Sequence, residues 1–147
     1  MSFVPGSFRG AGQSAHPGQI DYRLIRRRTI DEFRRGRLSR LDICDAQSEL
    51  MRAARNVGRE RAEPCPICDG PELVLVTFAF GAKLPAHGRC MTTQKEMQRL
   101  ARRLDEVACY VVEVCAACAW NHLLRTFPLG GRGRLSANGS SASSPKL

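Results

Sequence analysis

The sequence ACYVVEVCAACAW, residues 108–120, joins an apolar run rich in valine directly to a pair of cysteines, Cys115 and Cys118. The run predicts a β-strand, because β-branched and aromatic residues favour extended backbone. The same Cys-x-x-Cys spacing occurs at Cys65 and Cys68, and 46 residues separate the two pairs. Two such hooks supply four thiolates, which is the ligand set of a tetrahedral zinc site.

We therefore predict that Cys65, Cys68, Cys115 and Cys118 bind one Zn²⁺ ion. Four thiolates fill the coordination shell and leave no position for a catalytic water, so the predicted zinc is structural. Many such hooks have glycine directly after the second cysteine, where a positive φ turns backbone amides toward sulfur. Here those positions hold Asp69 and Ala119, so the sequence defines the ligands better than the geometry of the hooks.

Other residues with metal-binding chemistry are His87, Cys90 and His122, and the sequence leaves open whether any of them contributes. We expect His87 and Cys90 to lie in an exposed loop and His122 to be packed or hydrogen-bonded. Cys44, Cys90 and Cys109 are expected to be free thiols, since an odd count of seven cysteines fits a metal site better than disulfides. A thioredoxin-type redox site is not favoured, because it needs one such pair at a helix N-terminus.

Residues 20–62 are predicted to be a helical segment. Residues 29–32 (TIDE) match a capping box, which places a helix start at Thr29 and an end near Gly36. Residues 39–42 (SRLD) predict the start of a second helix of about 18 residues that closes at Gly58. Its apolar stripe is Ile43, Ala46, Leu50, Ala53 and Val57.

Residues 63–129 are predicted to form a domain similar to a zinc ribbon. Residues 73–80 (LVLVTFAF) predict a strand, residues 83–91 a loop, and residues 120–127 a strand or short helix. Residues 93–96 (TQKE) match another capping box, and the helix that they open has an apolar side of Met97, Leu100, Ala101 and Leu104. This order resembles zinc-ribbon proteins, in which two hooks face each other across a small antiparallel sheet.

The predicted fold class is therefore α+β, with an N-terminal helical pair followed by a small antiparallel sheet that contains one inserted helix. Residues 1–19 and 130–147 are expected to be disordered tails, since they hold too few large apolar residues to offset chain entropy. No window has the roughly 18–20 apolar residues of a membrane span. The start, MSFVPGSFRG, lacks the pattern of a secretory signal. We expect a cytoplasmic protein.

The formal net charge is +9, and it is unevenly distributed. Residues 21–62 hold 12 arginines against 7 acids, and residues 92–104 hold four bases against one acid. Such a surplus fits either an anionic partner, most often nucleic acid, or simply a solvated surface. The candidate contacts to phosphate are Arg26, Arg27, Arg28, Arg99, Arg102 and Arg103. Trp120 is a candidate for stacking on a base, and the alternative is that it covers the zinc as part of the core.

The sequence contains no glycine-rich phosphate loop, nucleophile elbow or His-Glu metal motif, so we predict no enzyme and no small-molecule substrate. A helix-turn-helix over residues 29–57 is disfavoured, because Asp42 and Asp45 would repel phosphate. The favoured function is a zinc-binding module that binds nucleic acid or a ribonucleoprotein or transcription machine. The alternative is a protein-interaction adaptor with an acidic protein partner. Salt weakens both kinds of binding, so nuclease sensitivity is needed to separate them.

The two hooks and the stretches SRLDICDA (39–46), LMRAAR (50–55) and WNHL (120–123) also carry a resemblance. From residue 22 to about residue 130, the chain resembles a small family of uncharacterised actinobacterial proteins. The resemblance implies a protein with a paired-cysteine metal site, and it implies no activity. The first twenty residues fall outside it.

Overall fold

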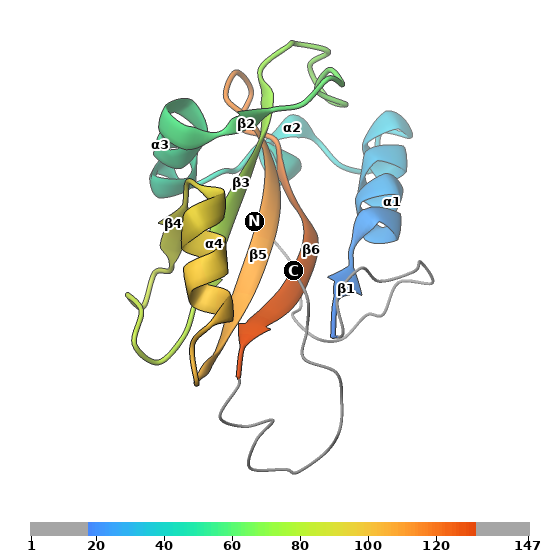
Figure 1. The fold of residues 1–147 in the computed structure, drawn as a ribbon. Helices are drawn as coiled ribbons and strands as arrows, with labels where there is room; N and C mark the ends of the chain where they lie inside the picture. The colour runs from blue at the N-terminus through green and yellow to red at the C-terminus, as the bar shows by residue number, and fades with distance from the viewer. Residues whose placement is uncertain (1–17, 132–147) are drawn as a thin grey trace.

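The computed structural model describes residues 18–131, which contain four helices and a six-stranded antiparallel sheet (Figure 1). The predicted α+β class is confirmed. The segments predicted to be tails, residues 1–19 and 130–147, lie almost wholly outside the described residues. No helix in residues 18–131 is both long and apolar enough to cross a membrane.

The centre of the sheet consists of three long strands, β3 (Leu73–Phe80), β5 (Glu106–Cys115) and β6 (Asn121–Gly130). Two short strands extend it, so that the order is β1-β6-β5-β3-β2, with β1 at Ile20–Asp21 and β2 at Arg59–Glu60. A further short strand, β4 (Arg89–Met91), pairs with the other half of β3. Strands from the predicted helical segment therefore join the same sheet as the strands of the predicted ribbon.

The register of the central strands places both hooks at one end of the sheet. Leu73, the first residue of β3, pairs with Cys115, the last residue of β5. The first hook lies shortly before β3, with four residues between Cys68 and Leu73, and the second hook is the turn between β5 and β6. Both lie at the upper end of the sheet in Figure 1. The antiparallel pairing thus brings together cysteines that are far apart in the sequence.

Helices cover both faces of the sheet, and a third apolar cluster surrounds the hooks. On one face, Leu50 and Ala54 of α3 (Ser48–Val57) pack against valines of β3 and β5. On the other, Leu100 of α4 (Gln94–Ala101) packs in a cluster with Ala79, Val107, Cys109, Phe127 and Leu129. Each fully buried aliphatic side chain contributes roughly 1.5–3 kcal/mol, so both faces of the central strands stabilise the fold.

The first helix begins earlier than predicted. Helix α1 spans Arg23–Arg34, and Thr29 lies inside it, where its hydroxyl donates a hydrogen bond to the Ile25 carbonyl. The capping-box prediction at Thr29 is therefore wrong. The helix begins at Arg23 because β1 pairs with β6, the Tyr22 amide donates to the Leu124 carbonyl, and Asp21 accepts a bond from the Arg23 amide.

The second predicted helix is divided in two. Helix α2 covers only Arg40–Ile43, and it starts where predicted, with a capping box between Ser39 and Asp42. The chain then leaves the helical path because the Ala46 amide donates to the Ala119 carbonyl in the second hook. Helix α3 spans Ser48–Val57, and Gly58 is its C-cap as predicted. A Cβ on Gly58 would lie 2.6 Å from Val74 Cγ2, so the position has no room for a side chain.

The inserted helix is close to its prediction. The Thr93 hydroxyl accepts a bond from the Glu96 amide at the start of α4, which confirms the helix start. Leu104, predicted to face inward, is 72% exposed because α4 ends at Ala101. Residues 89–91, predicted to be loop, form β4, and residues 121–130 form a strand rather than a helix.

The two threonines provide a matched test of the helix starts. Thr93→Ala removes an N-cap and should lower the free energy of unfolding by about 1 kcal/mol. Thr29→Ala places alanine inside a helix and should change it by less than about 0.5 kcal/mol. Urea denaturation followed by circular dichroism measures both, and equal losses would contradict this assignment of the helix starts.

Candidate metal centre

The structure brings together the four predicted ligands. The sulfur atoms of Cys65, Cys68, Cys115 and Cys118 all lie within 4.8 Å of one another. Cys65 Sγ is 3.7 Å from Cys118 Sγ, and Cys68 Sγ is 3.6 Å from Cys115 Sγ. A tetrahedron with metal–sulfur bonds of about 2.3 Å has edges of about 3.8 Å. The four cysteines therefore fit a single metal ion.

The two hooks form the same turn twice. In the first, the Cys65 amide donates to the Gly70 carbonyl and the Asp69 amide donates to the Cys65 carbonyl. In the second, the Cys115 amide donates to the Trp120 carbonyl and the Ala119 amide donates to the Cys115 carbonyl. This repetition explains how unrelated neighbouring sequences present a cysteine pair in the same way.

Asp69 and Ala119 adopt the left-handed conformation that glycine holds in many such hooks. Their φ angles are 60° and 69°. In the first hook, the amides of Ile67 and Gly70 point at sulfur, at 3.4 Å from Cys65 Sγ and Cys68 Sγ respectively. The absence of glycine after the second cysteine thus does not prevent the geometry, although it leaves a non-glycine residue in a strained region.

Burial divides the four thiols into two pairs. Cys65 and Cys115 are buried completely, whereas Cys68 and Cys118 are partly exposed. Burial raises the pKa of Cys65 to about 11 and also raises the pKa of Cys118. Burial acts in the same direction on Cys68, but the Gly70 amide and the neighbouring sulfurs outweigh it and lower the pKa. A bound cation supplies the charge that holds such buried groups as thiolates.

Trp120 covers the centre from inside the protein. Its side chain is fully buried in the cluster that includes Cys65 and Cys115, and its indole N–H donates to Glu113 Oε2 at 2.8 Å. The prediction that Trp120 stacks on a base is therefore wrong, because neither face of the ring is open. The alternative role, as a cover of the metal site, agrees with its position.

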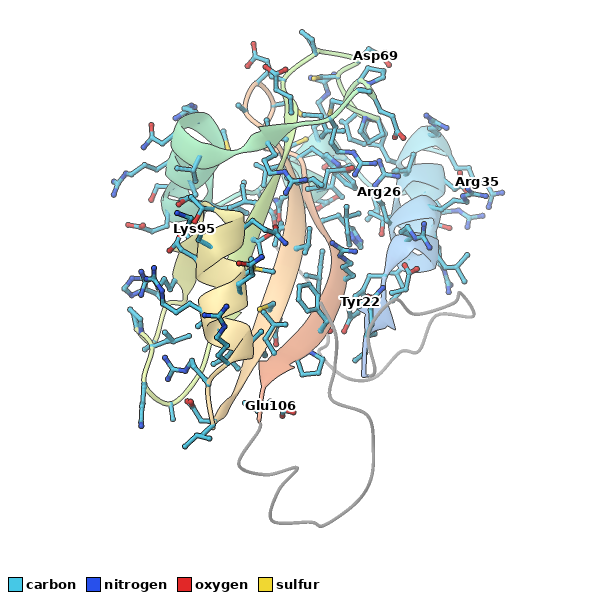
Figure 2. The ribbon with its side chains drawn as sticks, in the orientation of Figure 1. Tyr22, Arg26, Arg35, Asp69, Lys95 and Glu106 are labelled. Atoms are coloured by element: carbon cyan, nitrogen blue, oxygen red, sulfur yellow. The ribbon has the colours of Figure 1, made fainter. Side chains whose placement is uncertain are left out.

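Arg26 also has an internal role. Its Nε donates to Glu113 Oε2 at 2.8 Å, and Glu113 is completely buried in β5. Figure 2 shows Arg26 turned toward the strands and Arg35 extending away from them. Arg26 is thus paired inside the protein through Nε, while its side chain stays 20% exposed and lines a cavity beside Arg27 and Arg34. Its contact to phosphate stays a prediction.

The other candidate ligands lie outside the cluster. His122 is buried, its Nδ1 is 2.7 Å from the Leu123 carbonyl, and burial lowers its pKa. His87 is exposed, as predicted, and lines a cavity with Phe78, Phe80 and Tyr110. Cys90 is half-buried in β4 rather than exposed. Within residues 18–131, only the two hooks supply a group of this kind.

A fifth cysteine lies beside the centre, and sequence reasoning did not identify it. The Cys44 thiol donates to Cys118 Sγ across 3.8 Å, and burial raises the pKa of Cys44. Asp45, the next residue, accepts a hydrogen bond from the Asn121 amide group at 2.9 Å. The spacing of Cys44 from the hooks gives no signal, because it lies 74 residues before Cys118.

The comparison with protein families assigns the chain. The model of the "Family of unknown function (DUF5318)" matches residues 14–143. The chain belongs to this family. It is similar to "Uncharacterized protein Rv0049" of Mycobacterium tuberculosis and "Uncharacterized protein Mb0050" of Mycobacterium bovis. Each is 41% identical over 111 residues, which cover 76% of this chain and 81% of the relative. The predicted relationship to uncharacterised actinobacterial proteins is confirmed, and no solved structure matches.

The ligand set predicts the metal content of cysteine variants. Cys65→Ser and Cys115→Ser should abolish stoichiometric metal binding and remove most of the stability, which is about 5–15 kcal/mol for a domain. Cys90→Ser, a half-buried control in β4, should keep one metal ion per chain, and so should Cys44→Ser. Inductively coupled plasma mass spectrometry measures the content. Loss of metal from Cys44→Ser would contradict the four-cysteine assignment.

The strained hook predicts a stabilising substitution. Ala119→Gly relieves a positive φ and should raise the free energy of unfolding by about 0.5–1 kcal/mol. Ala117→Gly is the control in the same hook, since Ala117 is exposed and has no positive φ. Ala117→Gly should leave the free energy of unfolding unchanged or lower it. A rise in the free energy of unfolding for both variants would contradict the explanation by the positive φ of Ala119. Thermal unfolding of the metal-loaded proteins compares them.

Proposed function

We propose that the protein is a non-enzymatic module in which one structural Zn²⁺ holds the hooks and helix α1 binds nucleic acid, either alone or within a ribonucleoprotein or transcription machine. The observation that carries the proposal is the exposed arginine surface of α1 and the turn after it, which we define as Arg27, Arg28, Arg34 and Arg35. In residues 18–131, none of these four has a carboxylate within ion-pair distance.

The geometry of α1 supports a binding role for this surface. Arg26, Arg27 and Arg34 line a cavity of about 520 Å³ between α1 and the first hook, which Asp31, Glu63 and Asp69 also line. These acids would repel phosphate inside the cavity, so the proposed contacts lie on the solvent side of the arginines. Figure 1 shows α1 standing beside the β1–β6 edge, away from α4. Guanidinium groups bind phosphate oxygens in a bidentate manner, and their positive charge gives affinity that depends on salt.

The basic residues of α4 contribute less to the proposal. Arg99 and Arg102 are exposed, but Arg103 Nη2 lies 2.8 Å from Asp105 Oδ2, which neutralises part of its charge. We therefore assign the main interface to α1, and we assign a supporting role to Arg99 and Arg102.

The choice of zinc rests on ligand chemistry. Four thiolates in a tetrahedral arrangement suit Zn²⁺ or an iron site, and a four-coordinate shell of protein ligands is typical of structural zinc. Such a shell leaves no position for an activated water, which supports a non-enzymatic role. Free thiols beside a thiolate centre fit a reducing compartment, and we propose that the protein acts in the cytoplasm.

The α1 surface can be tested by charge removal. Exchanging Arg27, Arg28, Arg34 and Arg35 for Gln should weaken binding to labelled single-stranded RNA and duplex DNA by about tenfold or more, and should reduce the salt slope by up to about 0.9 per lost phosphate contact. Zinc content should stay the same, because none of the four contacts the hooks by hydrogen bonds in residues 18–131. Fluorescence anisotropy at several salt concentrations measures both quantities.

The control is Arg52→Gln with Arg55→Gln, two exposed arginines on α3. If the control loses as much binding affinity per removed charge, the attraction depends on net charge and not on one surface. That result would contradict an interface on α1. Affinity capture of the tagged protein from its own cells, with and without nuclease, separates the partner classes. An acidic protein that is retained after nuclease treatment would replace this proposal with the adaptor function.

A further inference from the structure

The cluster of cysteines contains one more sulfur than a tetrahedral metal centre uses. Cys44 Sγ lies 3.8 Å from Cys118 Sγ, nearly the same as the 3.7 Å between Cys118 and its fellow ligand Cys65. A metal ion bound to the two hooks holds four sulfurs and leaves the Cys44 thiol free to react. Cys44 and Cys118 are both partly exposed, whereas Cys65 and Cys115 are buried completely, so a small solute reaches the first two more readily.

The backbone holds Cys44 at this position. Cys44 follows α2 as its C-cap, and its amide donates to the Arg40 carbonyl at 2.7 Å. Two residues later, the Ala46 amide donates to the Ala119 carbonyl at 3.1 Å, in the same hook that contains Cys118. Ile43 packs in the cluster with Cys115 and Trp120. The closeness of the two sulfurs thus follows from contacts on both sides of Cys44.

We infer that Cys44 and Cys118 form a peroxide-sensitive thiol pair, in which oxidation joins them by a disulfide and releases the metal. The inference rests on the metal centre proposed above. A disulfide has a sulfur–sulfur distance of about 2.05 Å, so the two atoms need to approach by about 1.8 Å. Side-chain rotation at the partly exposed pair supplies a movement of this size.

The chemistry balances with hydrogen peroxide as the oxidant. The Cys118 sulfur attacks one peroxide oxygen, the O–O bond breaks, and Cys118 becomes a sulfenic acid while the other oxygen leaves as water. Cys44 sulfur then attacks the Cys118 sulfur, the S–S bond forms, the S–O bond breaks, and a second water leaves. Together the two sulfurs lose two electrons, and peroxide accepts them with two protons. These protons come from the thiol of Cys44 and from solvent.

The disulfide would remove Cys118 as a ligand, so that Cys65, Cys68 and Cys115 alone would hold a metal ion. A structural site depends on its complete set of thiolates, so its affinity falls and the ion dissociates. A dithiol reductant restores both sulfurs and lets the metal bind again. The centre would then respond to oxidant reversibly, through a residue that is not a ligand.

The test uses the full-length, metal-loaded protein and hydrogen peroxide. Metal release is followed with a chromophoric chelator, and peptide mass spectrometry maps the cross-links. The wild-type protein should lose 2 Da in step with metal release through a Cys44–Cys118 disulfide. Cys44→Ser cannot form this disulfide, so its loss of 2 Da should fall at least about tenfold, and it should accumulate a sulfenic acid on Cys118 that dimedone traps. Cys90→Ser, the half-buried control in β4, should behave as wild type.

Different results overturn different statements. Cross-links between Cys65 and Cys118 or between Cys68 and Cys115 would overturn this inference and leave the metal centre intact. A loss of 2 Da from Cys44→Ser equal to that of the wild-type protein would do the same. A protein that holds no metal before oxidation would overturn the centre and this inference with it. Cross-link mapping in the wild-type protein needs no variant, so the test does not depend on the folding of Cys44→Ser.

Discussion

The pairing of β3 with β5 is the constraint on which the metal centre depends. Leu73 pairs with Cys115, and this places the start of β3, five residues after Cys68, opposite the first residue of the second hook. A slip of one residue would turn every side chain of β3 to the other face. Helices cover both faces, so such a slip disrupts two apolar clusters and separates the sulfurs. The core and the cysteines therefore specify the same register independently, and agreement of this kind favours a single fold.

Glu113 joins the helical segment to the second hook. Its buried carboxylate accepts hydrogen bonds from Arg26 of α1 and from Trp120, and Arg61 Nε lies 3.5 Å from its other oxygen. Burying a carboxylate costs several kcal/mol, and removing one partner of such a group costs about 3–5 kcal/mol more. We therefore attribute to Glu113 an orienting role rather than a large net stabilisation. It fixes the angle at which α1 meets the sheet and separates Arg26 from its exposed neighbours.

The sequence was most informative where local chemistry decides the structure. Residue type and spacing predicted three features that the structure contains. These are the strand at residues 73–80, the cap at Thr93 and the two hooks. The start of α1 was mispredicted because the pairing of Ile20 with Thr126 anchors the chain before Thr29, and no local pattern encodes a contact across 106 residues. The break after α2 has a similar cause, since Ala119 accepts the bond that draws Ala46 out of the helical path. Cys44 and Glu113 became significant only through tertiary contacts.

The structure also assigns a location to the positive charge that composition could only count. Five of the 12 arginines in residues 21–62 form ion pairs with acids, which neutralise their charge locally. They are Arg23, Arg26, Arg37, Arg52 and Arg61. The exposed arginines of α1 and the following turn lie on a helix that is fixed at both ends. Its N-terminus follows the paired strand β1, and Ile30 and Phe33 near its C-terminus pack in the cluster that contains Cys65 and Cys115. Because α1 and the hooks share this apolar cluster, the packing around the four cysteines also positions the arginine surface.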